Sequence, residues 1–126
     1  MKQIYILLIA LLMGLSANAE ESGTCGPNLT WHLTDNGVLT ISGKGEMYDY
    51  SDDNRDRAPW DNYNIKRIII GDGVTTIGRY AFAGCIFLTS VTISNSVTTI
   101  GEYAFRDCIY NHRTTKTNQK YPSVNL

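Results

Sequence analysis

The chain has 126 residues, with 11 basic and 12 acidic side chains and a formal net charge of −1 at pH 7. This length corresponds to one small domain with a modest core. The near balance of charge argues against nucleic acid or an anionic membrane surface as a partner, because those partners favour strongly basic chains.

The first nineteen residues have the features of a secretory signal peptide. Lys2 supplies a positive charge, residues 4–15 form an apolar run, and Ala17-Asn18-Ala19 is a small-residue cleavage site. A transmembrane helix needs about 20 predominantly apolar residues, and this run is shorter. We therefore expect cleavage near Ala19 and a secreted or cell-surface protein that has no membrane span once the signal is removed.

Residues 20–64 are predicted to form a β-rich entry module that begins with a hairpin. Apolar residues alternate with polar ones on both sides of Asp35-Asn36-Gly37, which is typical of two strands with one buried face. A three-residue loop at this point sets Leu33 opposite Leu39 and brings the large apolar side chains onto that face. Such a loop is a type I turn closed by a left-handed glycine, here Gly37. We expect the hairpin to cover the open end of the segment that follows.

A polar loop over residues 43–63 completes the entry module, and Ala58-Pro59-Trp60 is expected to return it to the core. Four aspartates of this loop are candidates for a calcium site: Asp49, Asp52, Asp53 and Asp56. Their spacing lacks the alternation and the glycine of an EF-hand loop. We interpret them as a solvated acidic loop, and we assign no metal site and no cofactor.

Aromatic residues of the entry module form a candidate platform for stacking sugars: Trp31, Tyr48, Tyr50, Trp60 and Tyr63. The favoured interpretation is that the two tryptophans cover the core and the tyrosines lie over it, since aromatic side chains bury a large apolar area. A glycan-binding role stays open as an alternative.

Residues 65–108 contain an internal repeat. The segments GDGVTTIGRYAFAGC at 71–85 and SNSVTTIGEYAFRDC at 94–108 align without gaps and are identical at nine of fifteen positions. The apolar pattern before each segment repeats with the same offset, so the chain has two complete units. A unit of this length cannot bury both sides of its apolar layer alone, and stacked units form a solenoid.

Each unit is predicted to contain two short strands and a corner. In the first unit, Ile68 and Ile70 alternate with an outward Ile69, which is the pattern of a strand with one buried face. The Val-Thr-Thr-Ile segment is sufficiently β-branched to form a second strand. Gly78 then allows a corner that a Cβ atom would obstruct, and Phe82 is placed to insert between coils. The second unit has a glycine and a phenylalanine at the equivalent positions.

Cys85 and Cys108 are one repeat period apart, whereas Cys25 belongs to the entry module. The register favours two stacked thiols that behave as small buried groups with a weak donor. A disulfide between them has stricter geometric requirements and is the less favoured alternative. The redox state of the three cysteines is left open.

The repeat pattern ends after Cys108. A third unit would need apolar residues where the chain has Asn111, Thr114 and Lys116. We interpret residues 109–126 as a degenerate or disordered tail. Truncation of a longer repeat protein is an open explanation.

These motifs resemble those of the BspA-like, or treponemal-type, leucine-rich repeat family of bacterial surface proteins. The resemblance rests on the VTTIGxYAFxxC repeat and on the entry segment SGTCGPNLTWHLTDNGVLTISGKGEMYDY with the APW and IKRIIIGDGVTTIG segments after it, and it covers residues 22–108. Together with the repeat pattern, it indicates a mainly β fold, with an N-terminal β-hairpin module that caps a short leucine-rich-repeat solenoid of two 23-residue coils. It also implies an exported adhesion protein whose partners are host or cell-surface proteins.

A binding module is expected rather than an enzyme. His32 and His112 lie near no recognisable nucleophile motif, and the cysteines of the repeats are explained by the coil, so no catalytic residue is assigned. The candidate binding residues are the outward strand positions, which should line one flat face: Arg67, Ile69, Ser90 and Thr92. A truncated, non-functional remnant and a carbohydrate-binding module are the alternatives.

Overall fold

The computed structural model describes residues 20–61, 63–108 and 113–116. The expected signal peptide therefore lies outside the described residues. Within them, no helix is long and apolar enough to cross a membrane. The described elements are strands: β1 (Glu21–Gly26), β2 (Leu29–Leu33), β3 (Val38–Gly43), β4 (Gly45–Glu46), β5 (Arg67–Ile70), β6 (Val74–Ile77), β7 (Ser90–Ile93), β8 (Thr99–Ile100) and β9 (Arg113–Lys116).

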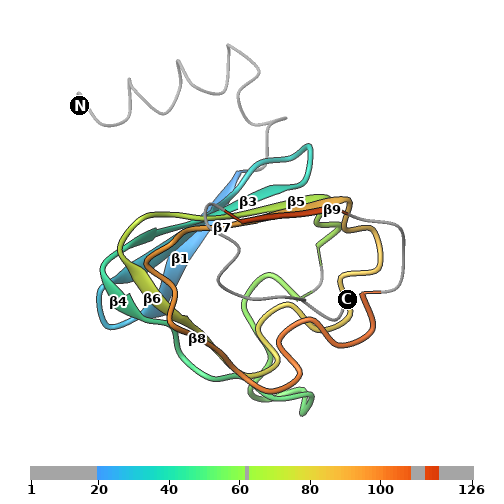
Figure 1. Ribbon diagram of the computed structural model, residues 1–126. Coiled ribbons are helices and arrows are strands. Elements are labelled where there is room, and N and C mark those ends of the chain that lie inside the picture. The colour runs from blue at the N-terminus through green and yellow to red at the C-terminus, as the bar shows by residue number, and fades with distance from the viewer. Residues whose placement is uncertain (1–19, 62, 109–112, 117–126) are drawn as a thin grey trace, which may run out of the picture.

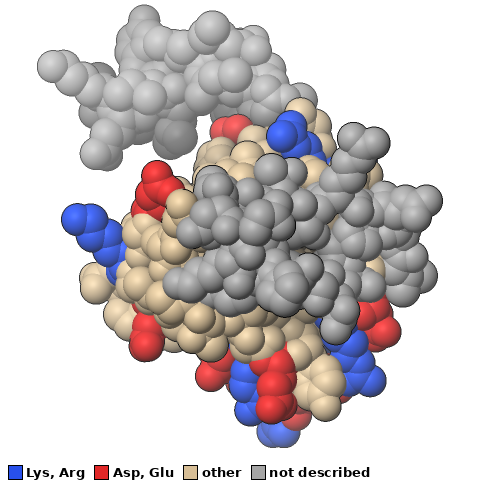
Figure 2. Space-filling model, viewed as in Figure 1, with Lys and Arg blue, Asp and Glu red and all other residues tan. Residues whose placement is uncertain are grey.

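The strands form two sheets on two sides of a coiled chain (Figure 1). The larger sheet has the order β1-β2-β3-β5-β7-β9, and the smaller has the order β4-β6-β8. From β3 through β5 and β7 to β9 the strands run parallel. The turns that follow β6 and β8 form the remaining side, and a group of charged side chains lies along this lower edge of the view (Figure 2).

The hairpin of the entry module has the predicted register. Leu33 is opposite Leu39 and Trp31 is opposite Ile41. Gly37 has a φ of 89° and its N–H donates to the Thr34 carbonyl at 3.0 Å, so the turn contains the left-handed glycine that this register requires. Strand β3 lies parallel to β5, and the hairpin covers the first coil as expected.

Both predicted strands are present in each repeat. In β5 the side chains of Ile68 and Ile70 are buried, Arg67 is exposed and Ile69 is half-buried. The Val-Thr-Thr-Ile segment forms β6 in the first repeat, and β8 is its counterpart in the second. The parallel pairing of equivalent residues in successive repeats confirms the solenoid.

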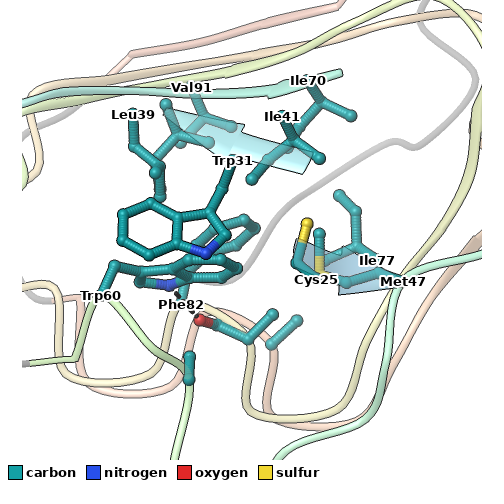
Figure 3. Packing of buried hydrophobic residues seen from close by; sticks show 14 of the residues in the cluster. Cys25, Trp31, Leu39, Ile41, Met47, Trp60, Ile70, Ile77, Phe82 and Val91 are labelled. Carbon is teal, nitrogen blue, oxygen red and sulfur yellow. Dashed lines mark hydrogen bonds between the residues drawn. The ribbon is translucent and has the colours of Figure 1, made fainter. Parts of the chain in front are cut away.

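The core is filled from both sheets and from the turns between them (Figure 3). The Trp60 ring stacks on the Phe82 ring with centroids 5.5 Å apart, and Phe82 packs on Phe105 at 5.3 Å. Phenylalanines of successive repeats are therefore inserted between the coils as predicted. Trp31 meets Trp60 edge to face at 5.7 Å, so the entry module and the repeats share one core.

The sequence pattern does not predict strands β1 and β4. Residues 21–26 have few apolar side chains, yet β1 pairs with β2 along its length. A Cβ atom on Gly23 would lie 2.8 Å from Trp31 Nε1, so the glycine lets this strand pass close to the indole. Strand β4 is two residues long and pairs with β6. Backbone pairing with a neighbour, rather than side-chain pattern, explains both elements.

The segment interpreted as a degenerate or disordered tail contains a strand at residues 113–116. These residues form β9, which pairs with β7 so that Ser90 is opposite Arg113 and Ile93 is opposite Lys116. The paired residues of β7 and β9 are separated by the same number of positions in the chain as the paired residues of β5 and β7. A strand at the end of a ladder is held by backbone hydrogen bonds, which do not require apolar side chains. The rest of the segment lies outside the described residues.

Candidate binding surface

Outward side chains of β3, β5 and β7 form a surface that we call the ladder face. Thr40, Ile69 and Thr92 are in register across the three strands. A second row contains Val38, Arg67 and Ser90. Adjacent strands of a sheet are about 4.8 Å apart, so each row is a straight line of closely spaced side chains.

The four residues predicted to bind all lie on the ladder face. Arg67 is exposed, whereas Ile69, Ser90 and Thr92 are half-buried. Within β3, β5 and β7, Arg67 is the charged member of these two rows, and the other side chains present hydroxyl and aliphatic groups. A surface of this kind offers a flat apolar strip with hydrogen-bonding groups and one cation.

Val38 and Thr40 belong to the same face but were missed by sequence reasoning. Their outward orientation follows from the alternation in the hairpin, whereas their alignment with β5 depends on a parallel pairing that the sequence does not encode locally. The exposed His32 is opposite Thr40 on β2, and its Nε2 is 3.4 Å from Glu20 Oε1. In the backbone register, Arg113 of β9 is opposite Ser90 and Thr115 is opposite Thr92.

The proposed sugar platform does not form around the tryptophans. Trp60 is 1% exposed, and its indole N–H donates to the Ala81 carbonyl at 2.8 Å. Trp31 is buried as well, while Tyr48 and Tyr63 are exposed. The interpretation in which both tryptophans cover the core is therefore confirmed.

The thiols are held inside the fold. Burial raises the pKa of the Cys25 thiol to about 12. A hydrogen bond with Cys108, together with burial, raises the pKa of the Cys85 thiol. Cys108 is buried and its Sγ donates to the Phe82 carbonyl at 3.1 Å. The hydrogen bond with Cys85 lowers the pKa of the Cys108 thiol, whereas burial acts in the opposite direction. The raised pKa values of Cys25 and Cys85 and the burial of Cys108 are typical of structural thiols rather than of nucleophiles.

Two aspartates of the loop, Asp53 and Asp61, are paired with arginines of the same loop. The Asp53 carboxylate accepts hydrogen bonds from Arg55, which lower the pKa of that carboxyl. Asp61 accepts from Arg57 Nη1 at 2.9 Å. Over the described part of the chain, no three His, Cys, Asp or Glu side chains converge in a way that could hold a metal ion.

Comparison with known proteins identifies the repeats. A family model for the BspA type leucine-rich repeat region (6 copies) matches residues 57–124, which is more than half of the chain. The chain belongs to the BspA-type leucine-rich repeat family. This membership confirms the resemblance seen in the repeat and entry motifs.

A solved structure of a leucine-rich repeat protein is similar in fold to this BspA-type chain. It is a crystal structure from Eubacterium ventriosum ATCC 27560, with a TM-score of 0.69 and 34% sequence identity. The similarity covers 79% of this chain and 26% of that chain, so the present chain spans about a quarter of the length of its structural relative. No curated protein matches the sequence.

Proposed function

We propose that this BspA-type chain is an exported protein-binding module of the adhesion type, and that it captures a partner protein on the ladder face. The observation that carries the proposal is the register of the two rows across β3, β5 and β7. Continuous strand faces are the usual binding surfaces of repeat proteins. Host or cell-surface proteins are the proposed partners.

The ladder face is suited to a partner because its side chains are already ordered. Ile69 and Thr92 are half-buried, so their side chains lose less conformational entropy on binding than fully exposed side chains would. Arg67 projects from the edge of this strip, where a carboxylate of a partner can pair with its guanidinium. A partner with an apolar strip bordered by an acidic group fits this arrangement.

The double variant Arg67→Glu with Thr92→Arg tests the proposal. Charge reversal and the added bulk should reduce the capture of solubilised cell-surface proteins in a pull-down with the immobilised protein. A matched variant, Arg55→Glu with Thr98→Arg, makes the same changes of charge at exposed positions away from the ladder face, and capture should persist. Equal capture by wild type and the ladder-face variant would exclude this face.

Export is proposed from the signal-like residues before Glu20. The N-terminal sequence of the protein recovered outside the cell should begin near Glu20, and recovery of an uncleaved chain from the cytoplasm alone would contradict export.

The continuous core supports a folded module over a misfolded remnant. We propose no catalytic activity, because the cysteines are held in the coil and His32 is paired with Glu20 at the surface.

A further inference from the structure

An open pocket of about 440 Å³ lies on the turn side of the coils, away from the ladder face. The loop of the entry module forms one wall, and the turns after β6 and β8 form the other. Charged groups gather along this edge of the molecule (Figure 2). The charged and aromatic side chains that line the pocket are Asp52, Arg57, Asp61, Tyr80, Arg106 and Asp107.

The loop wall is held in place by its own hydrogen bonds. Arg57 Nη1 donates to Asp61 Oδ2 at 2.9 Å, and Arg57 Nη2 donates to the Asp52 carbonyl at 3.1 Å. The Ser51 N–H donates to the Asp56 carbonyl at 2.9 Å. This wall therefore presents a guanidinium beside carboxylates in a fixed arrangement before any ligand arrives.

Among the described residues, the wall formed by the coils contains one aromatic side chain, that of Tyr80. Tyr80 lines the pocket, and its ring lies 5.0 Å from that of Tyr103. The Arg106 guanidinium lies over the Tyr103 ring at 5.3 Å and is 3.6 Å from the Asp107 carboxylate. Tyr80 and Tyr103 both have left-handed backbones, with φ of 55° and 59°. Glycine would adopt this conformation with less strain. Tyr103 is 51% exposed and Tyr80 is half-buried, so core packing does not explain the Tyr103 side chain.

The lining selects against ions and apolar ligands. Both arginines that line the pocket are paired with carboxylates, Arg57 with Asp61 and Arg106 with Asp107. An anion would therefore meet negative charge as well as positive. The aliphatic side chains of the lining are small, those of Ala58 and Ala83, so an apolar anchor of a peptide would find no deep apolar surface. Alternating acceptors and donors beside an aromatic ring suit a neutral ligand that carries several hydroxyl groups.

We propose that this pocket binds a neutral oligosaccharide, with one sugar ring stacked on Tyr80. Asp52 and Asp61 accept hydrogen bonds from sugar hydroxyls, and Arg57 and Arg106 donate to sugar oxygens. This site is separate from the ladder face and takes a different class of ligand. The repeat places tyrosine at the same point of both coils, so the saccharide site belongs to the repeats and does not depend on the buried tryptophans.

Titration of the purified protein with cellobiose, maltose and lactose tests the proposal. The readout is the set of ¹H–¹⁵N signals, including the side-chain Nε–H groups of Arg57 and Arg106. At least one disaccharide should change the chemical shifts of the pocket residues, and this change should reach a plateau as the sugar concentration rises. Tyr80→Gly should weaken binding about tenfold or more and keep the fold, because glycine accepts the left-handed backbone. Tyr80→Phe retains the ring and should retain binding.

Matched variants and a charged probe complete the experiment. Arg106→Gln should weaken binding about tenfold, since a charged hydrogen-bond donor is lost, whereas Arg55→Gln changes an exposed arginine outside the pocket and should leave binding unchanged. Glucose 6-phosphate should bind no more tightly than glucose. Absence of saturable shifts with all three disaccharides, equal weakening by Arg55→Gln, or tighter binding of the phosphorylated sugar would each overturn the proposal.

Discussion

At the scale of single residues, Trp60 joins the entry module to the repeats. Its ring contacts Trp31 of β2 and Tyr50 of the loop, with centroids 5.7 and 5.8 Å away, and stacks on Phe82 of the first coil. Its indole N–H donates to the Ala81 carbonyl. One side chain therefore provides both apolar contact and a hydrogen bond at the junction.

Trp60→Ala should destabilise the protein strongly. Loss of a large buried aromatic side chain costs about 3–5 kcal/mol, and the Ala81 carbonyl loses its donor. Trp60→Phe keeps much of the apolar contact and should cost less, about 1–3 kcal/mol, mainly through that unpaired carbonyl. Urea unfolding followed by circular dichroism measures both changes.

Tyr63→Ala is the matched control for Trp60, because Tyr63 is an exposed aromatic residue of the same segment. Its effect on the free energy of unfolding should stay within about 0.5 kcal/mol. Equal free energies of unfolding for Trp60→Ala and Tyr63→Ala would contradict the conclusion that Trp60 stabilises the junction.

At the scale of elements, the corner after the second strand of each repeat depends on close backbone approach. A Cβ atom on Gly78 would lie 1.9 Å from the Tyr48 carbonyl oxygen, and one on Gly101 would lie 2.6 Å from Arg79 N. Neither glycine has a positive φ. Space, and not backbone conformation, therefore requires glycine at these corners, as the sequence predicted.

Gly78→Ala should lower the free energy of unfolding by about 1–3 kcal/mol, because the added methyl forces the backbone of the loop away from the coil. Gly84→Ala provides a comparison within the same repeat. There a Cβ atom meets nothing within 4 Å, and the φ of 78° leaves conformational strain as the cost, which should be about 1 kcal/mol.

Thermal unfolding of the two variants by circular dichroism separates steric from conformational effects. The midpoint should fall further for Gly78→Ala than for Gly84→Ala. The reverse order would mean that the Tyr48 backbone moves aside easily and that the corner does not depend on close packing.

At the scale of the whole molecule, the entry module and the repeats share one sheet and one core. The larger sheet passes from β2 and β3 to β5 and β7 without interruption, and buried side chains of both parts form one cluster. We therefore expect tryptophan fluorescence and far-UV circular dichroism to report the same urea transition.

Native-state hydrogen exchange provides an independent check of this cooperativity. The most protected amides of β2 and β7 should open with similar free energies, since one core supports both strands. Fluorescence that changes at lower urea than circular dichroism, or β2 amides that open well before those of β7, would show that the entry module unfolds separately.

The sequence by itself determined the repeat period, the inward side chains of β5 and β7, the hairpin register and the glycine corners. Each follows from a local pattern: alternation along a strand, the length of a loop, or a repeated motif. The outward orientation of Arg67, Ile69, Ser90 and Thr92 follows from the same alternation. The family resemblance drawn from these motifs was confirmed by the family model.

Tertiary structure alone decided the placement of the edge strands and of the pocket. Strands β1 and β9 form because backbone groups of a neighbouring strand pair with them, and hydrogen bonds of this kind leave little trace in side-chain pattern. Val38 joins the ladder face, and Tyr80 meets Asp61 at one pocket, because the coil brings together segments that are distant in the chain. Local sequence pattern specifies which way a side chain points, whereas the stacking of coils decides which side chains become neighbours.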